Sequence, residues 1–121
     1  MIQGIRTIFV RTIFVGFHCW QGAPLEVKFL RNEHRHRFFV EVEFGVSTVD
    51  RDIEYFVALS WVDRAIENLY AESGFRMGGK SCESICDELA AELVYEMKLN
   101  SLKSVAVFED GENGSKLYIG E

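Results

Sequence analysis

The feature that most constrains the fold of this chain is an alternation of residue types that begins at position 34 and is clean from Val40 onward. One face of this segment carries histidine and then apolar side chains, and the other carries mostly charged ones. The first face comprises His34, His36, Phe38, Val40, Val42 and Phe44, and the second comprises Arg35, Arg37, Phe39, Glu41 and Glu43. Successive side chains of a β-strand point to opposite faces of its sheet. The alternation therefore predicts a long strand over residues 34–47, with one buried face and one solvated face.

Three other segments are typical of strands. Residues 5–17 are rich in Ile, Phe, Val and Thr, which favour extended structure. Residues 103–109 and the closing segment KLYIG are apolar, and the sequence DGENGS between them is typical of a hairpin turn. The sequence thus predicts four strands in two pairs.

Two helices are predicted between these pairs. Asp50 or Asp52 is the expected N-cap of the first helix, which spans roughly 18 residues with Glu54 in its first turn. Its apolar residues form two adjacent stripes, which predicts packing on more than one side. Ser81 is the expected N-cap of the second helix, with Glu83 in its first turn.

The order of elements, ββααββ, predicts an α+β fold in a single domain over residues 1–121. Four antiparallel strands would form one sheet, with both helices on one of its faces. Such a sheet leaves two edges unpaired, and proteins normally cover exposed edges. We therefore expect a homo-oligomer.

Composition excludes several classes of function. The formal net charge of -6 argues against binding of nucleic acid polymers, which requires a positive field. No apolar run reaches the length of a membrane span, and the N-terminal segment lacks the features of a signal peptide. The 3 cysteines form no framework pattern and fit a reducing compartment. We expect a cytoplasmic protein with no membrane partner.

Several short motifs occur in an order that resembles a known family. Residues 14–18, FVGFH, are similar to an F-x-(A/S)-x-H pattern, and residues 34–38, HRHRF, are similar to H-G-H followed by an aromatic residue. Residues 81–83, SCE, match a Ser/Thr-x-Glu helix start, Glu109 ends an apolar strand, and residues 118–121 read YIGE. In this order the motifs resemble, across the whole chain, the tunnelling-fold enzymes related to 6-pyruvoyltetrahydropterin synthase and 6-carboxytetrahydropterin synthase.

The resemblance implies a zinc ion held by His18, His34 and His36. It also implies that Glu109 anchors the ring of a pterin, in a pocket shared between subunits of an oligomeric barrel. Ser81 and Glu83 are expected to contribute to the same ligand pocket.

The residues themselves support a metal site but leave an alternative open. His34 and His36 share one face of a strand, and His18 can approach them from a neighbouring strand. Three neutral imidazoles with an open fourth position suit catalytic zinc. The alternative is a solvated strand end plus an isolated His18. Glu109 has a similar alternative, in which it merely begins a turn together with Asp110.

The sequence departs from the family at the positions that perform proton transfer. Leu30 occupies the position of the family's catalytic cysteine, and Leu can neither donate nor accept a proton. The family's Asp-His pair is missing from the corresponding stretch IENLYAESG. Cys19 and Cys82 are possible substitutes, but Cys82 and Cys86 fall on the apolar face of a helix, where cysteine is usually inert. The catalytic residues are therefore unknown.

Two basic residues are further candidates for ligand binding. Residues 74–81, GFRMGGKS, match the P-loop pattern, but no buried parallel strand precedes them, which argues against nucleotide hydrolysis. Lys80 and the free N–H groups at the start of the second helix could still bind a phosphate. Arg35 replaces the glycine of H-G-H, and is either an ordinary surface charge or a contact to an anionic ligand or another subunit.

Three functions remain open. The first is a divergent binding protein that holds a pterin, purine or nucleotide in an intersubunit pocket without the parent catalysis, for sequestration or sensing. The second is an active zinc-dependent lyase acting on 7,8-dihydroneopterin triphosphate, and the third is a structural oligomer. Loss of the proton-transfer residues alongside a retained Glu109 favours the first.

Overall fold

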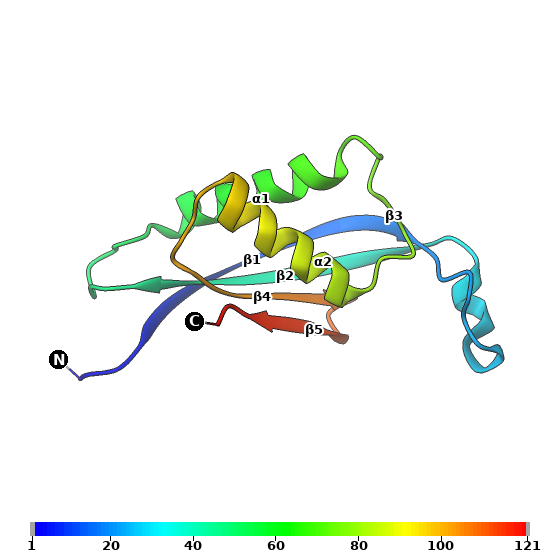
Figure 1. Ribbon diagram of the computed structural model, residues 1–121, viewed down its shortest axis with the longest axis horizontal. Helices are drawn as coiled ribbons and strands as arrows, with labels where there is room; N and C mark the ends of the chain where they lie inside the picture. Colours follow the sequence, from blue (N-terminus) through cyan, green and yellow to red (C-terminus); the bar gives the residue numbers. More distant parts are fainter. Residues whose placement is uncertain (1, 121) are drawn as a thin grey trace.

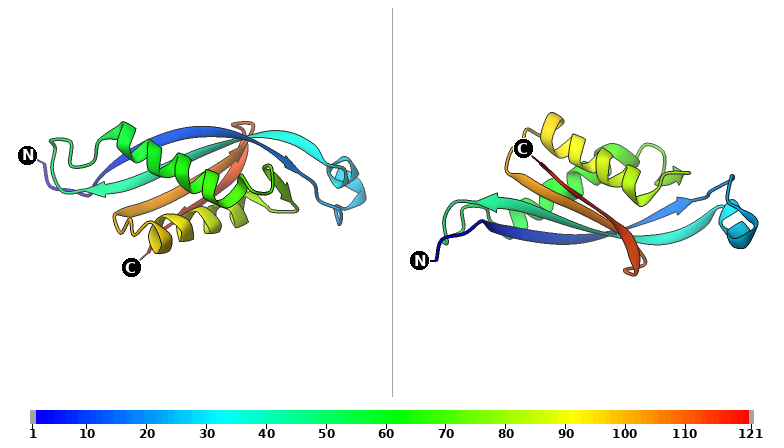
Figure 2. Two further views of the ribbon diagram at one scale, coloured as in Figure 1. Left: turned by 90° about the horizontal axis from the view of Figure 1, so that it is seen from above. Right: turned by 60° about the horizontal axis from the view of Figure 1, so that its bottom comes forward.

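Five strands form one twisted sheet in the order β3-β1-β2-β4-β5 (Figures 1 and 2). The computed structural model describes residues 2–120, so Glu121 of the YIGE ending lies outside the described residues. The strands are β1 (Arg6–His18), β2 (His34–Val46), β3 (Arg76–Gly78), β4 (Leu102–Glu109) and β5 (Asn113–Tyr118).

The two long strands β1 and β2 pair antiparallel from one end to the other, with Arg6 opposite Val46 and His18 opposite His34. β4 continues the sheet antiparallel to β2, and β5 pairs antiparallel with β4. The predicted alternation in β2 is confirmed, because Phe38 and Phe44 are both 0% exposed. The side chains between them on the same face are buried too, so this face of the sheet packs against the hydrophobic core.

The prediction of four antiparallel strands is wrong by one strand. β3 lies in the glycine-rich segment after the first helix and pairs parallel with the end of β1. Two backbone hydrogen bonds hold it there, from Phe17 N to Phe75 O at 2.9 Å and from Cys19 N to Gly78 O at 2.8 Å. Three residues are too few to produce a visible alternation, so this strand depends on tertiary contact with β1.

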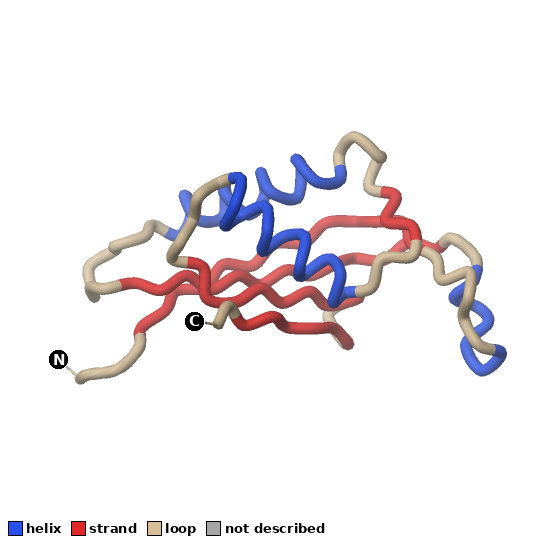
Figure 3. Tube along the Cα trace, in the orientation of Figure 1, coloured by secondary structure: helices blue, strands red, loops and turns tan. Residues whose placement is uncertain are grey.

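Both helices lie over one face of the sheet, as predicted (Figure 3). Helix α1 (Tyr55–Tyr70) packs over β1, and helix α2 (Cys82–Ala91) packs over β4 and β5. A short π-helical turn, η2 (Glu92–Glu96), extends α2. A 3-10 helix, η1 (Leu25–Arg31), lies in the β1–β2 connection and projects from the end of the sheet (Figure 1).

The start of α1 differs from the prediction. Glu54 is the N-cap, and its carboxylate accepts hydrogen bonds from the N–H groups of Phe56 and Val57. Asp52 instead accepts from the backbone N–H and hydroxyl of Ser47, and Arg51, in the turn between them, has a positive φ of 51°. Ser81 caps α2 as predicted, accepting from Ser84 N.

Helix α1 packs against β1 and also against α2 and η2, so it has contacts on more than one side as expected, although the residues at its start are exposed. Phe56 is 78% exposed and Val57 is 47% exposed. Its buried residues, Ala58, Val62, Ala65, Ile66 and Tyr70, follow a single stripe. Across residues 2–120, no helix is long and apolar enough to cross a membrane.

Candidate metal centre and adjoining cleft

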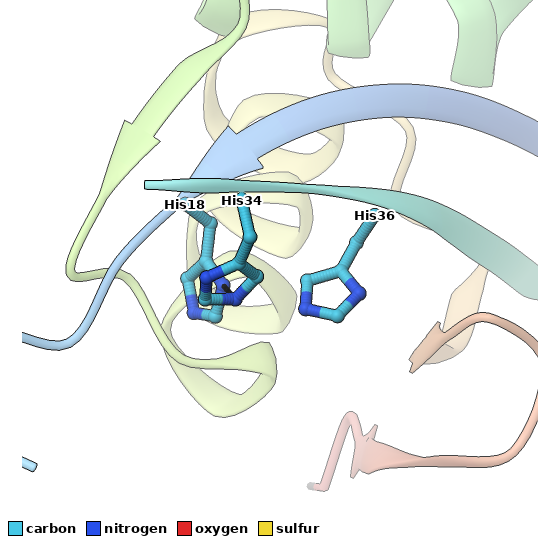
Figure 4. Close-up of side chains that lie close together, drawn as sticks. All are labelled: His18, His34 and His36. Carbon is cyan, nitrogen blue, oxygen red and sulfur yellow. Dashed lines mark hydrogen bonds between the residues drawn. The ribbon is translucent and has the colours of Figure 1, made fainter. Parts of the chain in front are cut away.

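Three histidines meet at one end of the β1–β2 pair, on the face of the sheet that the core covers. His18 is the last residue of β1, and His34 is the first residue of β2 and its direct partner. His36 lies two residues further along β2, on the same face as the buried Phe38. Figure 4 shows the three rings on one side of the sheet, close to one another. The strand alternation therefore brings the histidines together as predicted.

The spacing of the rings suits a single metal ion. One ligand nitrogen from each histidine lies within 4.8 Å of the other two. Ring centroids are 4.6 Å apart for His34 and His36 and 5.0 Å apart for His18 and His34, in both cases edge to face. Among the described residues, this is the one cluster of at least three such side chains with metal-binding spacing.

Hydrogen bonds set the tautomers of two of these rings. His34 Nδ1 lies 2.7 Å from the carbonyl oxygen of Asn32, so this nitrogen carries the proton and donates it. His36 Nδ1 lies 2.7 Å from Asp110 Oδ2 and donates to that carboxylate. In the neutral rings, Nε2 of both histidines is then unprotonated, which is the form that binds a metal. His36 Nε2 is buried and has no hydrogen-bond partner within the described chain.

His18 completes the cluster as a neutral ring. Its Nδ1 lies 3.2 Å from His34 Nε2 and donates to that lone pair. Burial lowers the pKa of His18, the charge of Glu109 opposes this, and the neighbouring His34 and His36 lower it further. A ring with a lowered pKa stays neutral at physiological pH and keeps a lone pair available.

Asp110 is a site residue that the sequence prediction missed. It follows Glu109 in the β4–β5 turn and has a φ of 54°, a left-handed conformation that Asp tolerates better than most residues. Its carboxylate accepts from His36 and from the backbone N–H of Arg37, and the Arg37 contact is the larger cause of its lowered pKa. The turn is thereby tied to β2, and the His36 ring is oriented.

Glu109 lies beside the histidines at the end of β4. Its Oε1 is 3.9 Å from His18 Nε2, and its Oε2 is 3.8 Å from His36 Nε2. The side chain is 32% exposed and faces a cleft of about 510 Å³. This carboxylate is therefore in contact with both the candidate metal centre and the cleft.

The cleft brings together several of the predicted ligand-binding residues. Ser81 and Glu83, from the start of α2, line it together with Glu109 and His18. Leu30 also lines the cleft. The full lining comprises His18, Trp20, Leu30, Gly79, Ser81, Cys82, Glu83, Glu109, Asn113 and Gly114.

Two predicted ligand-binding residues are not among those lining the cleft. Arg35 lies on the face of β2 opposite the histidines, next to Arg37. Lys80 lies near the start of α2, but its Nζ is 2.8 Å from Glu88 Oε2. Tyr70 OH donates to the other oxygen of Glu88 at 2.8 Å, and burial raises the pKa of Tyr70 so that it remains the donor. Lys80 and Tyr70 thus both contact Glu88, and this set of contacts links α1 to α2.

Cys82 is the cysteine that lines the cleft, and it is a thiol. Burial is the main cause that raises its pKa to about 12, with the charge of Glu109 adding to it. A reactive cysteine needs a lowered pKa. The Cys82 thiol is therefore not activated as a nucleophile.

Comparison with known proteins assigns the architecture to a class. No protein-family model matches this chain, and no curated protein sequence matches it. Solved structures do match, and they show that the chain has the fold of the pterin synthases, as its motifs predicted. The 6-pyruvoyl tetrahydropterin synthase of Caenorhabditis elegans has a TM-score of 0.66 at 12% identity, over 97% of both chains. An uncharacterized protein from Wolinella succinogenes has a TM-score of 0.68 at 14% identity, over 96% of this chain and 99% of that one.

Proposed function

We propose that this chain is a divergent pterin-synthase-like protein that binds a pterin, purine or nucleotide-type ligand in the cleft beside the three histidines. The observation that carries the proposal is the position of Glu109, whose carboxylate faces the cleft while Leu30 stands where the family has its cysteine. In this proposal the protein keeps the ligand pocket and has lost the parent catalysis.

The chemistry of Glu109 selects the kind of ligand. A partly buried carboxylate needs hydrogen-bond donors, and its two oxygens match two adjacent N–H groups on one edge of a planar ring. Pterins and guanine present such an edge. Ser81 and Glu83, which also line the cleft, offer further hydrogen bonds to the same ring. A phosphate on the ligand would have to compete with Glu88 for the ammonium group of Lys80.

The three histidines fit a zinc ion. His36 Nε2 is a buried acceptor without a partner, and His34 Nε2 keeps a lone pair because its Nδ1 donates to Asn32. His18, His34 and His36 would hold the ion, which could polarise an oxygen of a bound ligand.

Loss of catalysis is supported by the residues available for proton transfer. Leu30 carries no acid or base, and the Cys82 thiol has its pKa raised to about 12 by burial. Binding without turnover is therefore favoured over an active lyase.

Self-association is part of the proposal. β3 and β5 are edge strands of the sheet. The face of β1 away from the helices exposes apolar side chains, among them Phe9 at 52% and Ile13 at 53%. A second copy could cover both features and close the cleft. Light scattering on the purified protein tests this, and a monomer at micromolar concentration would contradict it.

A ligand panel tests the binding function. Pterin, neopterin, guanine, guanosine and guanosine monophosphate would be titrated calorimetrically into the wild-type chain, Glu109→Gln and Glu112→Gln. Glu112 lies in the same turn, is exposed and does not line the cleft, so it is the matched control. We expect at least one compound to bind, with tenfold or greater loss in Glu109→Gln alone. Binding by none of them would overturn the proposal, and turnover of 7,8-dihydroneopterin triphosphate would favour the lyase.

A further inference from the structure

We propose that Glu109 is a fourth protein ligand of the metal, and that a planar ligand must draw this carboxylate away from the metal in order to bind. This rests on the proposed function, since it assumes that the histidines hold a metal and that Glu109 anchors a ring. It adds a coupling between the two: the metal site is closed in the ligand-free protein and opens when the cleft is filled.

The first support is the way the acceptor atoms face one another. Because His36 Nδ1 donates to Asp110 and His18 Nδ1 donates to His34, both rings turn an Nε2 lone pair toward Glu109. The carboxylate oxygens are also acceptors. Lone pairs that face one another repel, and a cation placed between them removes the repulsion.

The distances match an ion better than a hydrogen bond. The carboxylate oxygens are 3.8 and 3.9 Å from the two Nε2 atoms, which exceeds the range of a hydrogen bond. Ligand atoms of a tetrahedral zinc ion lie about 3.3 Å apart, given metal–ligand distances of about 2.0 Å. A shift of roughly half an ångström therefore brings these two Glu109–histidine distances to zinc geometry, and the three histidine nitrogens, which lie within 4.8 Å of one another, also have to draw together around the ion.

The second support is the freedom of the Glu109 side chain. It makes no hydrogen bond to another described side chain, whereas Asp110 next to it is held by both His36 and Arg37. Glu109 also lines the cleft and is 32% exposed. One carboxylate can thus reach the metal or the cleft without breaking another contact.

The two roles compete for the same oxygens. When both oxygens accept N–H groups from a planar ring, they leave the metal, whose fourth position becomes open. The coupling must be reciprocal, so a ring that weakens metal binding is itself bound more weakly when metal is present.

The test begins with the metal alone. Zinc affinity would be measured by competition with a chromophoric chelator for the wild-type chain, Glu109→Gln and the control Glu112→Gln. Cobalt(II) absorption would report the coordination number in each. Glu109 is partly exposed at a strand end, so Glu109→Gln should fold, and circular dichroism checks this. We expect tenfold or greater loss of zinc affinity and weaker cobalt absorption in Glu109→Gln only. Zinc affinity within twofold of wild type would overturn the proposal.

The second arm adds pterin and guanosine to the zinc-loaded wild-type chain. We expect that any compound that binds will reduce the affinity of the chain for zinc. The same compound should bind more tightly to the metal-free chain than to the zinc-loaded chain, and by the same factor. If Glu109→Gln loses pterin binding but keeps its zinc affinity, the proposed function stands and the fourth-ligand inference falls. If it loses zinc affinity while no planar compound binds the wild type, the proposed function falls and Glu109 is a permanent ligand. A wild-type chain that binds no zinc overturns the inference outright.

Discussion

The carboxylate of Asp110 accepts a hydrogen bond from His36 Nδ1 at 2.7 Å and from the backbone N–H of Arg37 at 3.0 Å. The contact sets the tautomer of His36 and leaves its Nε2 with the lone pair that a metal would bind. Carboxylates in this position raise the basicity of metal-binding histidines. Asp110 therefore links the β4–β5 turn to the candidate metal centre.

Asp110→Asn should weaken zinc binding by roughly tenfold to a hundredfold, because the amide lacks the charge that supports the ring. Chelator competition measures the effect. Glu112→Gln, which removes a charge from the same turn without touching a histidine, should bind zinc like the wild type. Equal affinity in Asp110→Asn would show that the charge of Asp110 does not support metal binding by His36.

Gly16 allows the core to pack beneath the histidines. A Cβ atom at this position would lie 2.9 Å from Phe38 Cε2 and 3.0 Å from Met77 Cγ. Phe38 is 0% exposed and stacks on Phe14 at 5.2 Å between ring centroids, so it has little room to move.

Gly16→Ala should therefore destabilise the protein by about 1–3 kcal/mol, as overpacking does in cores. Urea unfolding followed by circular dichroism measures it. Gly4→Ala is the matched control, since nothing lies within 4 Å of the added methyl group. An unchanged midpoint in Gly16→Ala would mean that Phe38 shifts freely.

The fold and the histidine cluster could be predicted because they depend on period-two alternation. Positions 34, 36 and 38 had to share a face, and the buried Phe38 places that face against the core. His18 could be predicted as a third member of the cluster because the end of one antiparallel strand lies beside the start of the next, and here His18 lies opposite His34. These relations require only the geometry of a strand.

The features that the sequence did not reveal depend on contacts between distant segments. β3 exists because residues 76–78 reach the free edge of β1. Lys80 in the P-loop-like segment looked available to a phosphate, but Glu88, two turns along α2, pairs with it. Asp110 looked like a turn residue, and its role follows only from the pairing of β4 with β2. Side-chain partners across the fold have no local signature.

The cysteines should differ sharply in reactivity. Cys82 is 7% exposed with its pKa raised to about 12, and Cys86 is 1% exposed with its pKa raised to about 11, in both cases mainly by burial. At pH 8 their thiolate fractions are about one in ten thousand and one in a thousand. Cys19 is only half-buried.

Ellman's reagent should therefore react quickly with one thiol in the native protein, and with the other two only on unfolding. Cys19→Ser should abolish the fast phase. A fast phase that survives in Cys19→Ser would show that the start of α2 opens and exposes Cys82.

The ionisation of Glu43 makes the free energy of unfolding fall at acidic pH. Ser104 Oγ donates to its Oε1 at 2.5 Å, and Thr7 Oγ1 donates to its Oε2 at 3.0 Å. The Ser104 hydrogen bond is the largest cause that lowers the pKa of Glu43 below its usual 4.5; burial opposes it, and Thr7 and Lys116 contribute further lowering. Because the folded pKa lies below the unfolded one, the stabilisation is complete above pH 4.5 and is lost as the pH falls through the folded pKa.

Ser104→Ala should destabilise the protein by about 1–2 kcal/mol at pH 7, where the charged carboxylate loses its main donor. The gap to the wild type should shrink as the pH falls and Glu43 becomes protonated in both proteins. Urea unfolding at a series of pH values measures both curves, with Ser101→Ala as a control whose hydroxyl does not contact Glu43. A gap that stays constant from pH 7 to strongly acidic pH would mean that Ser104 contributes packing alone, and that the charge of Glu43 is stabilised elsewhere.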